Sequence, residues 1–99
     1  MTAPELWQAT LDGPSVRALA GDLLAAAEVH DVRVKGSARG HALSQTPALA
    51  DAIDALLGGQ VRGVQITYTG SGEGWVDTLL SGSEGFRICR MRQANAQGE

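Results

Sequence analysis

Hydrophobic positions in the first sixty residues recur mainly with the period of an α-helix. The spacing in Thr2-Ala3-Pro4-Glu5 is that of a capping box and predicts a short helix over residues 3–11. A second helix is predicted from Pro14 onward, because its apolar residues fall three and four apart: Val16, Leu19, Ala20, Leu23, Leu24 and Ala27. A third is predicted between Thr46, a suitable N-cap, and the glycine pair Gly58-Gly59.

Alternation with a period of two predicts four strands. The first covers 30–35, where His30, Val32 and Val34 share one face. The others cover 61–69, 75–80 and 86–92, and the glycine-rich turns 70–74 and 81–85 join them into an antiparallel meander. The predicted order is α-α-β-α-β-β-β. We therefore expect an α+β fold of two layers, with helices packed on one face of a mostly antiparallel sheet.

Two of the predicted strands carry apolar side chains on both faces, although a two-layer fold needs only one apolar face. On one strand Trp75 and Leu79 alternate with Val76 and Leu80, and on the last strand Phe86 and Ile88 alternate with Cys89 and Met91. One set on each strand must point away from the helices. Such a patch is typical of a protein partner or a ligand. Three interpretations remain open: coverage by loops and Trp7, a symmetric homodimer through the sheet face or its free edge, or a ligand groove.

Composition limits the classes of function. A chain of 99 residues with 43% hydrophobic residues predicts one domain over 1–92 and a disordered polar tail at 93–99. The net charge of −3 disfavours a nucleic-acid binder, and one Cys with two His is too few for a usual structural zinc site, so no metal or cofactor is expected. The sequence shows neither a secretory signal pattern nor a membrane-length apolar run, which predicts a cytoplasmic protein without a membrane contact.

Candidate binding chemistry is confined to two places. The predicted interaction surface consists of Trp75, Asp77, Leu79, Cys89 and Met91. Within it, Trp75 and Asp77 could bind a small planar or cationic ligand, or they could fill the core and accept hydrogen bonds from an arginine or a turn amide. The second place is a glycine-containing loop with Lys35, Arg39 and His41, which is either a possible anion-binding or ligand loop or an ordinary solvated loop.

No catalytic residues are predicted, because neither histidine has a serine or cysteine in a nucleophile motif nearby. We therefore expect a non-catalytic protein-interaction or accessory module, a homodimer that uses the outer sheet face or the edge strand. The alternative is a small-molecule-binding or sensor domain with a pocket near Trp75 and Asp77. A winged-helix DNA-binding protein is less favoured, because its recognition helix would carry Asp51 and Asp54 and no basic residue.

Overall fold

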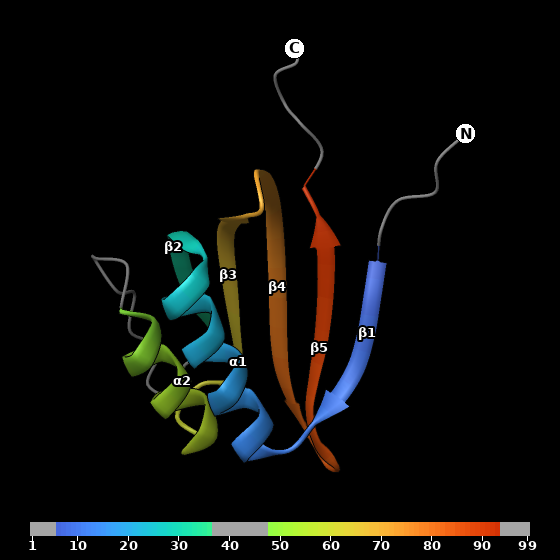
Figure 1. The fold of residues 1–99 in the computed structure, drawn as a ribbon. Coiled ribbons are helices and arrows are strands. Elements are labelled where there is room, and N and C mark those ends of the chain that lie inside the picture. The colour runs from blue at the N-terminus through green and yellow to red at the C-terminus, as the bar shows by residue number, and fades with distance from the viewer. Residues whose placement is uncertain (1–5, 37–47, 94–99) are drawn as a thin grey trace.

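The computed structural model describes residues 6–36 and 48–93, in which two helices lie on one face of a five-stranded sheet (Figure 1). In chain order the elements are β1 (Leu6–Leu11), α1 (Gly13–Ala26), β2 (Glu28–Lys35), α2 (Leu49–Leu57), β3 (Gly63–Gly70), β4 (Glu73–Gly82) and β5 (Gly85–Arg92). The strands are ordered β1-β5-β4-β3-β2, and all neighbours are antiparallel. The α+β class with two layers is as predicted, and β1 and β2 are the two edges of the sheet.

The first element is a strand, so the helix predicted over 3–11 was wrong. Residues 6–11 pair with β5 without interruption, from Leu6 opposite Met91 to Leu11 opposite Phe86. A helix of this length is not stable by itself, whereas pairing with the last strand satisfies the backbone hydrogen-bonding groups on one side of the segment. The capping-box residues Thr2–Glu5 lie outside the described residues. The observed order is β-α-β-α-β-β-β.

Helix α1 begins where the sequence predicted. The Asp12 carboxylate is its N-cap and accepts a hydrogen bond of 2.9 Å from the backbone N–H of Ser15. Val16, Ala20 and Leu23 are buried against the sheet, but Leu24 is 57% exposed. The predicted apolar stripe was therefore too wide. Leu24 lies about two helical turns after Arg17, so both side chains point to the same exposed side of the helix.

Helix α2 begins at Leu49, with Ala48 as an N-cap that makes no side-chain hydrogen bond. The predicted N-cap, Thr46, lies outside the described residues. The helix buries Leu49, Ala52, Ile53 and Leu56, and it ends at Gly58, followed by Gly59 with a left-handed φ of 81°. Neither helix in the described part of the chain is both long enough and apolar enough to span a membrane.

Strands β3, β4 and β5 form the predicted meander, with tighter turns than expected. The β3–β4 turn consists of Ser71 and Gly72, whose φ angles of 55° and 80° are both left-handed, as in a type I′ hairpin. The β4–β5 turn likewise has two residues, because Gly82 pairs with Gly85. The flanking glycines that the sequence placed in the turns therefore belong to the strands.

A β-bulge in β2 changes the predicted alternation of its first residues. The register with β3 shifts between Val29 and Asp31, so His30 does not share the face of Val32 and Val34. The His30 side chain is exposed, and its Nε2 atom lies 2.7 Å from the Thr69 hydroxyl oxygen. The prediction that His30 lies on the apolar face was wrong, since one extra residue reverses the side to which a strand position points.

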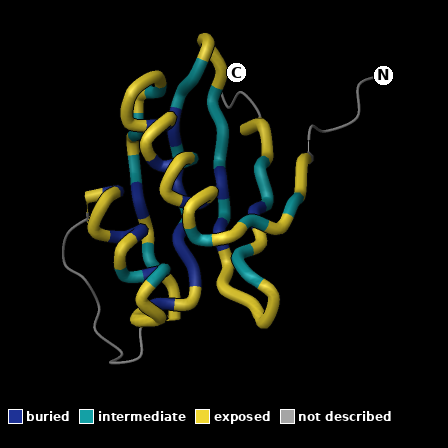
Figure 2. The backbone as a smooth tube through the Cα atoms, turned by 60° about the horizontal axis from the view of Figure 1, so that its bottom comes forward, coloured by how far each residue is buried: buried dark blue, intermediate teal, exposed yellow. Residues whose placement is uncertain are grey.

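The core lies between the sheet and the helices and is almost entirely aliphatic. Ile53, Leu56, Ile66, Leu79 and Ile88 are among its fully buried members. Tyr68 is the one aromatic residue among the buried hydrophobic residues of the described ranges. Buried positions concentrate where helices and central strands meet, and exposure increases toward β1 and the strand ends (Figure 2). The helices thus leave one part of the sheet less covered than the rest.

Candidate functional site

The strand registers show which of the predicted interaction residues lie on the helix-covered face. Trp75 lies opposite Tyr68 and Leu79 lies opposite Val64. Directly opposite residues of an antiparallel pair point to the same side, so Trp75, Asp77 and Leu79 share the face of the buried β3 residues. Asp77 and Leu79 are 0% exposed. These two side chains therefore lie in the interior and are not available to a partner.

Cys89 and Met91 point to the opposite, outer face of the sheet. Cys89 pairs with Thr78, and Met91 pairs with Val76. The five residues predicted as one interaction surface are consequently divided between two faces. The reason is the period of two: Trp75, Asp77 and Leu79 are odd-numbered on β4, and the β5 residues opposite them are even-numbered.

The outer face carries an apolar strip that neither described helix covers, because both helices lie on the other side of the sheet (Figures 1 and 2). The strip consists of Val76, Leu80, Cys89 and Met91. Leu80 is 43% exposed and Met91 is 49% exposed, while Val76 and Cys89 are half-buried. The adjoining β3 positions are polar, among them Gln65 and Thr67. The predicted surplus of apolar side chains on β4 and β5 therefore exists.

A polar cluster is built into the helix-covered face around Asp77. Its Oδ1 atom accepts hydrogen bonds from the Tyr68 hydroxyl at 3.1 Å and from Arg90 Nε at 2.9 Å, and its Oδ2 atom accepts one from Arg90 Nη2 at 2.8 Å. The Arg90 side chain is 30% exposed. Its guanidinium carbon lies 5.8 Å from the Trp7 ring centre and 6.0 Å from that of Tyr68, so the cation is between two aromatic rings.

This cluster explains the buried charge and changes the acid–base properties of its members. Burial raises the pKa of the Tyr68 hydroxyl to about 12, and the neighbouring Asp77 carboxylate adds to the increase. The hydrogen bonds to Asp77 raise the pKa of Arg90. The Asp77 carboxylate thus accepts hydrogen bonds from an arginine, which is the structural alternative to ligand binding that the sequence left open. Both of its oxygens already have a hydrogen-bond donor.

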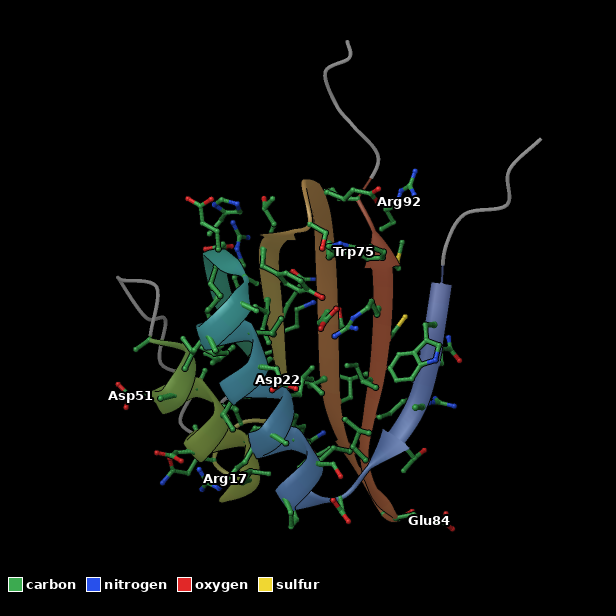
Figure 3. The ribbon with its side chains drawn as sticks, viewed as in Figure 1. Arg17, Asp22, Asp51, Trp75, Glu84 and Arg92 are labelled. Atoms are coloured by element: carbon green, nitrogen blue, oxygen red, sulfur yellow. The ribbon has the colours of Figure 1, made fainter. Side chains whose placement is uncertain are left out.

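Trp75 lies beside this cluster at the end of the sheet where β5 ends (Figure 3). It pairs with Arg92, whose Nη1 atom is 3.2 Å from a carboxylate oxygen of Glu73. The Trp75 side chain is half-buried and packs against the hydrophobic core. This position is consistent with the structural interpretation of Trp75 and leaves only part of the ring accessible.

The predicted anion-binding loop is mostly outside the described residues. Lys35 is exposed at the end of β2, where its backbone carbonyl accepts a hydrogen bond of 2.9 Å from the N–H of Arg62. Arg39 and His41 lie in the segment 37–47, which the structure does not describe. Within the described ranges, no group of three or more His, Cys, Asp or Glu side chains is arranged to hold a metal ion.

The two edges of the sheet differ in charge and regularity. Edge strand β2 carries Glu28, Asp31, Arg33 and Lys35 and contains the bulge. Edge strand β1 reads LWQATL, has no charged residue, and pairs with β5 in an unbroken register. Its Trp7 is 52% exposed. A bulge and edge charges prevent further strand pairing, so β2 has such protection and β1 lacks it.

Sequence reasoning missed both Trp7 and the β1 edge as parts of a site. The helical interpretation of 3–11 concealed them, although LWQATL alternates in a pattern that also fits a strand. The sequence did not identify Arg90 as the arginine that contacts Asp77, because nothing local indicates that the two residues lie opposite each other. Comparison with protein families, with characterised proteins and with solved structures finds no match for this chain. The site is therefore interpreted from its geometry.

Proposed function

We propose that this protein is a non-catalytic interaction module that forms a homodimer through the free edge of β1. The observation that carries the proposal is the contrast between the two edges: β2 is charged and bulged, whereas β1 is regular, uncharged and carries an exposed tryptophan. An unprotected edge strand presents unpaired backbone N–H and C=O groups to any second strand. Pairing two such edges joins the two sheets into one.

Trp7 supplies an apolar contribution at the same edge. It points to the helix-covered side, since it lies opposite Arg90 on β5. No described helix lies over β1 (Figure 1). Because the Trp7 residue is 52% exposed, covering part of it on dimerisation would contribute on the order of 1 kcal/mol for each subunit. The backbone pairing and this aromatic contact would therefore act at the same place.

The outer face offers the competing mode of self-association, through Leu80 and Met91. Analytical ultracentrifugation over a range of protein concentrations distinguishes the two modes. Gln8→Lys places a charge on the β1 edge and is expected to shift the protein to monomer, because charged side chains on an edge strand oppose pairing and the two introduced charges would lie on the same face near the dimer axis. Thr78→Lys is the matched control, as it places the same charge on the outer face at the centre of the sheet and is expected to leave the dimer intact.

Three results bear on this proposal. Loss of the dimer in Gln8→Lys alone supports the β1 edge. Loss in Thr78→Lys alone transfers the interface to the outer face. A wild-type chain that remains monomeric at high concentration refutes self-association altogether. Circular dichroism of each variant checks that the fold is retained.

Small-molecule binding is a second candidate function. The sequence predicted a planar or cationic ligand beside Trp75 and Asp77, but one observation favours an anionic ligand beside Arg90. Arg90, and not Asp77, is the polar group of the cluster that reaches the surface, and its Nη1 atom has no hydrogen-bond partner among the described residues. This arrangement favours an anionic ligand over a cationic one. A thermal-shift screen of carboxylates and phosphates tests it, with Arg90→Met expected to abolish any hit.

A further inference from the structure

The symmetry of an antiparallel edge pair restricts how two copies of β1 can meet. A twofold axis perpendicular to the joined sheet places the helices of both subunits on the same side. Opposite residues must then point to the same face, so an odd-numbered residue can pair only with an odd-numbered residue. Two registers use five residues of each six-residue strand: one is centred on Gln8 and the other on Ala9.

We propose, on the basis of the dimer proposed above, that a second copy of this chain pairs in the register centred on Ala9. In this register Ala9 faces Ala9 of the partner subunit, Trp7 faces Leu11 of the partner subunit, and Gln8 faces Thr10 of the partner subunit. The large aromatic side chain is thus placed against a leucine, and the small alanines lie on the axis between the two tryptophans. A leucine covers more of the aromatic surface than an alanine does, and removing apolar surface from water stabilises the pair.

The register centred on Gln8 provides a poorer match for the same strand. It places Trp7, a residue that is 52% exposed, opposite Ala9 of the partner subunit, which covers less of it than Leu11 would. It also leaves Leu11 beyond the paired residues. On the outer face neither register brings charged side chains together, because the β1 residues on that face are Leu6, Gln8 and Thr10. The helix-covered side therefore decides between them.

The occupant of the β1 edge is a second β1 rather than the β2 edge of another copy. Pairing β1 with β2 would join different surfaces, so it would continue into a larger ring or an open chain of subunits and would not stop at two. The bulge between Val29 and Asp31 and the charges of β2 also interrupt a regular ladder. Pairing β1 with β1 closes after two subunits and uses the uncharged edge of each.

Disulfide cross-linking tests the register. In a Cys89→Ser background, which removes the single native thiol, Ala9→Cys places two thiols across the axis of the proposed register, and Gln8→Cys does so for the other. Opposite Cα atoms in an antiparallel pair lie about 4.5–5.5 Å apart, which a disulfide can bridge. Thr78→Cys in the same background measures cross-linking by random collision.

We expect Ala9→Cys to cross-link under mild oxidation at least tenfold faster than Gln8→Cys and Thr78→Cys. Faster cross-linking of Gln8→Cys would overturn the proposed register while leaving the edge dimer in place. If both β1 variants cross-link no faster than Thr78→Cys although ultracentrifugation shows a dimer, pairing through β1 is overturned in either register. A monomeric wild-type chain would instead show that the proposed function itself has failed.

Discussion

Replacing Asp77 by asparagine removes one negative charge from the interior with almost no change in side-chain shape. In the native structure both carboxylate oxygens accept hydrogen bonds, from Tyr68 and from two nitrogens of Arg90. In Asp77→Asn the amide NH2 that replaces one carboxylate oxygen can only donate, so it would face a nitrogen of Arg90 that is also a donor. The substitution therefore breaks a buried ion pair without leaving a cavity.

The structure sets the expected magnitude near the lower end of the usual range. Breaking a fully buried ion pair costs about 3–5 kcal/mol of unfolding free energy. Asp77 is 0% exposed, but the Arg90 side chain is 30% exposed and can regain some hydration. We therefore expect a loss of about 3 kcal/mol, which corresponds to a decrease in Tm of roughly 12–24 °C for a domain of this size.

Urea unfolding followed by circular dichroism at a fixed protein concentration measures the loss. The matched control is Asp54→Asn, because the Arg17–Asp54 pair has a similar separation of 2.9 Å but both of its side chains are 60% exposed. That substitution should cost about 0–1 kcal/mol. The two pairs thus differ in burial and in the number of hydrogen bonds that the carboxylate accepts, three for Asp77 and one from Arg17 for Asp54.

A double-mutant cycle with Arg90→Met distinguishes a specific pair from general damage. The single substitution Arg90→Met leaves Asp77 buried with one hydrogen-bond donor, so the double variant should be about 2 kcal/mol more stable than the sum of the single losses implies. The reasoning is refuted if Asp77→Asn costs no more than Asp54→Asn. It is also refuted if the losses of the cycle add within about 0.5 kcal/mol.

Three further predictions follow from individual contacts. Tyr68 is the one tyrosine of the chain, so ultraviolet titration of the folded protein should show tyrosinate forming near pH 12 instead of near pH 10. Since the pKa is raised on folding, its contribution to stability is complete below pH 10 and is lost as the pH rises through 12; Tyr68→Phe should remove this loss. Gly85→Ala places a Cβ atom 2.7 Å from the backbone oxygen of Leu11, at a φ of 131°. It should destabilise the fold more than Gly72→Ala, because a Cβ atom at position 72 has the same kind of backbone strain, at a φ of 80°, but meets no atom within 4 Å. Leu23→Ala should cost about 2–4 kcal/mol in thermal or urea unfolding, whereas Leu24→Ala, at a position 57% exposed, should change stability by less than about 0.5 kcal/mol; equal losses for the two leucines would contradict the assigned face of α1.

Local sequence patterns correctly predicted the helices whose apolar spacing extends over several turns and whose ends are marked by capping residues, proline or glycine. The Asp12-Gly13-Pro14 segment marks the start of α1, and the glycine pair at 58–59 marks the end of α2. The hairpin strands were also predictable, because alternating residues and glycine turns act over short distances. The short segment 6–11 was not, since its conformation depends on pairing with β5 at the other end of the chain.

The candidate site was harder to predict than the fold because its parts are distant in sequence. Composition and alternation predicted that β4 and β5 carry more apolar side chains than one face requires, and that Asp77 shares a face with Trp75. The hydrogen bonds from Tyr68 and Arg90 to Asp77 depend on the registers of two hairpins, and the stacking of Trp7 on Arg90 depends on where β1 docks.

The amino-acid sequence by itself determined an acidic α+β domain with few aromatic residues and an aliphatic core, because composition and hydrophobic periodicity can be read without knowing which segments pair. Only the tertiary structure decided that Asp77 is buried beneath Arg90 and that β1, with Trp7, is the uncharged edge of the sheet. A one-residue shift in register moves every side chain of a strand to the opposite face. Strand pairing between distant segments therefore determines which residues reach the surface, and with them the interface proposed for this protein.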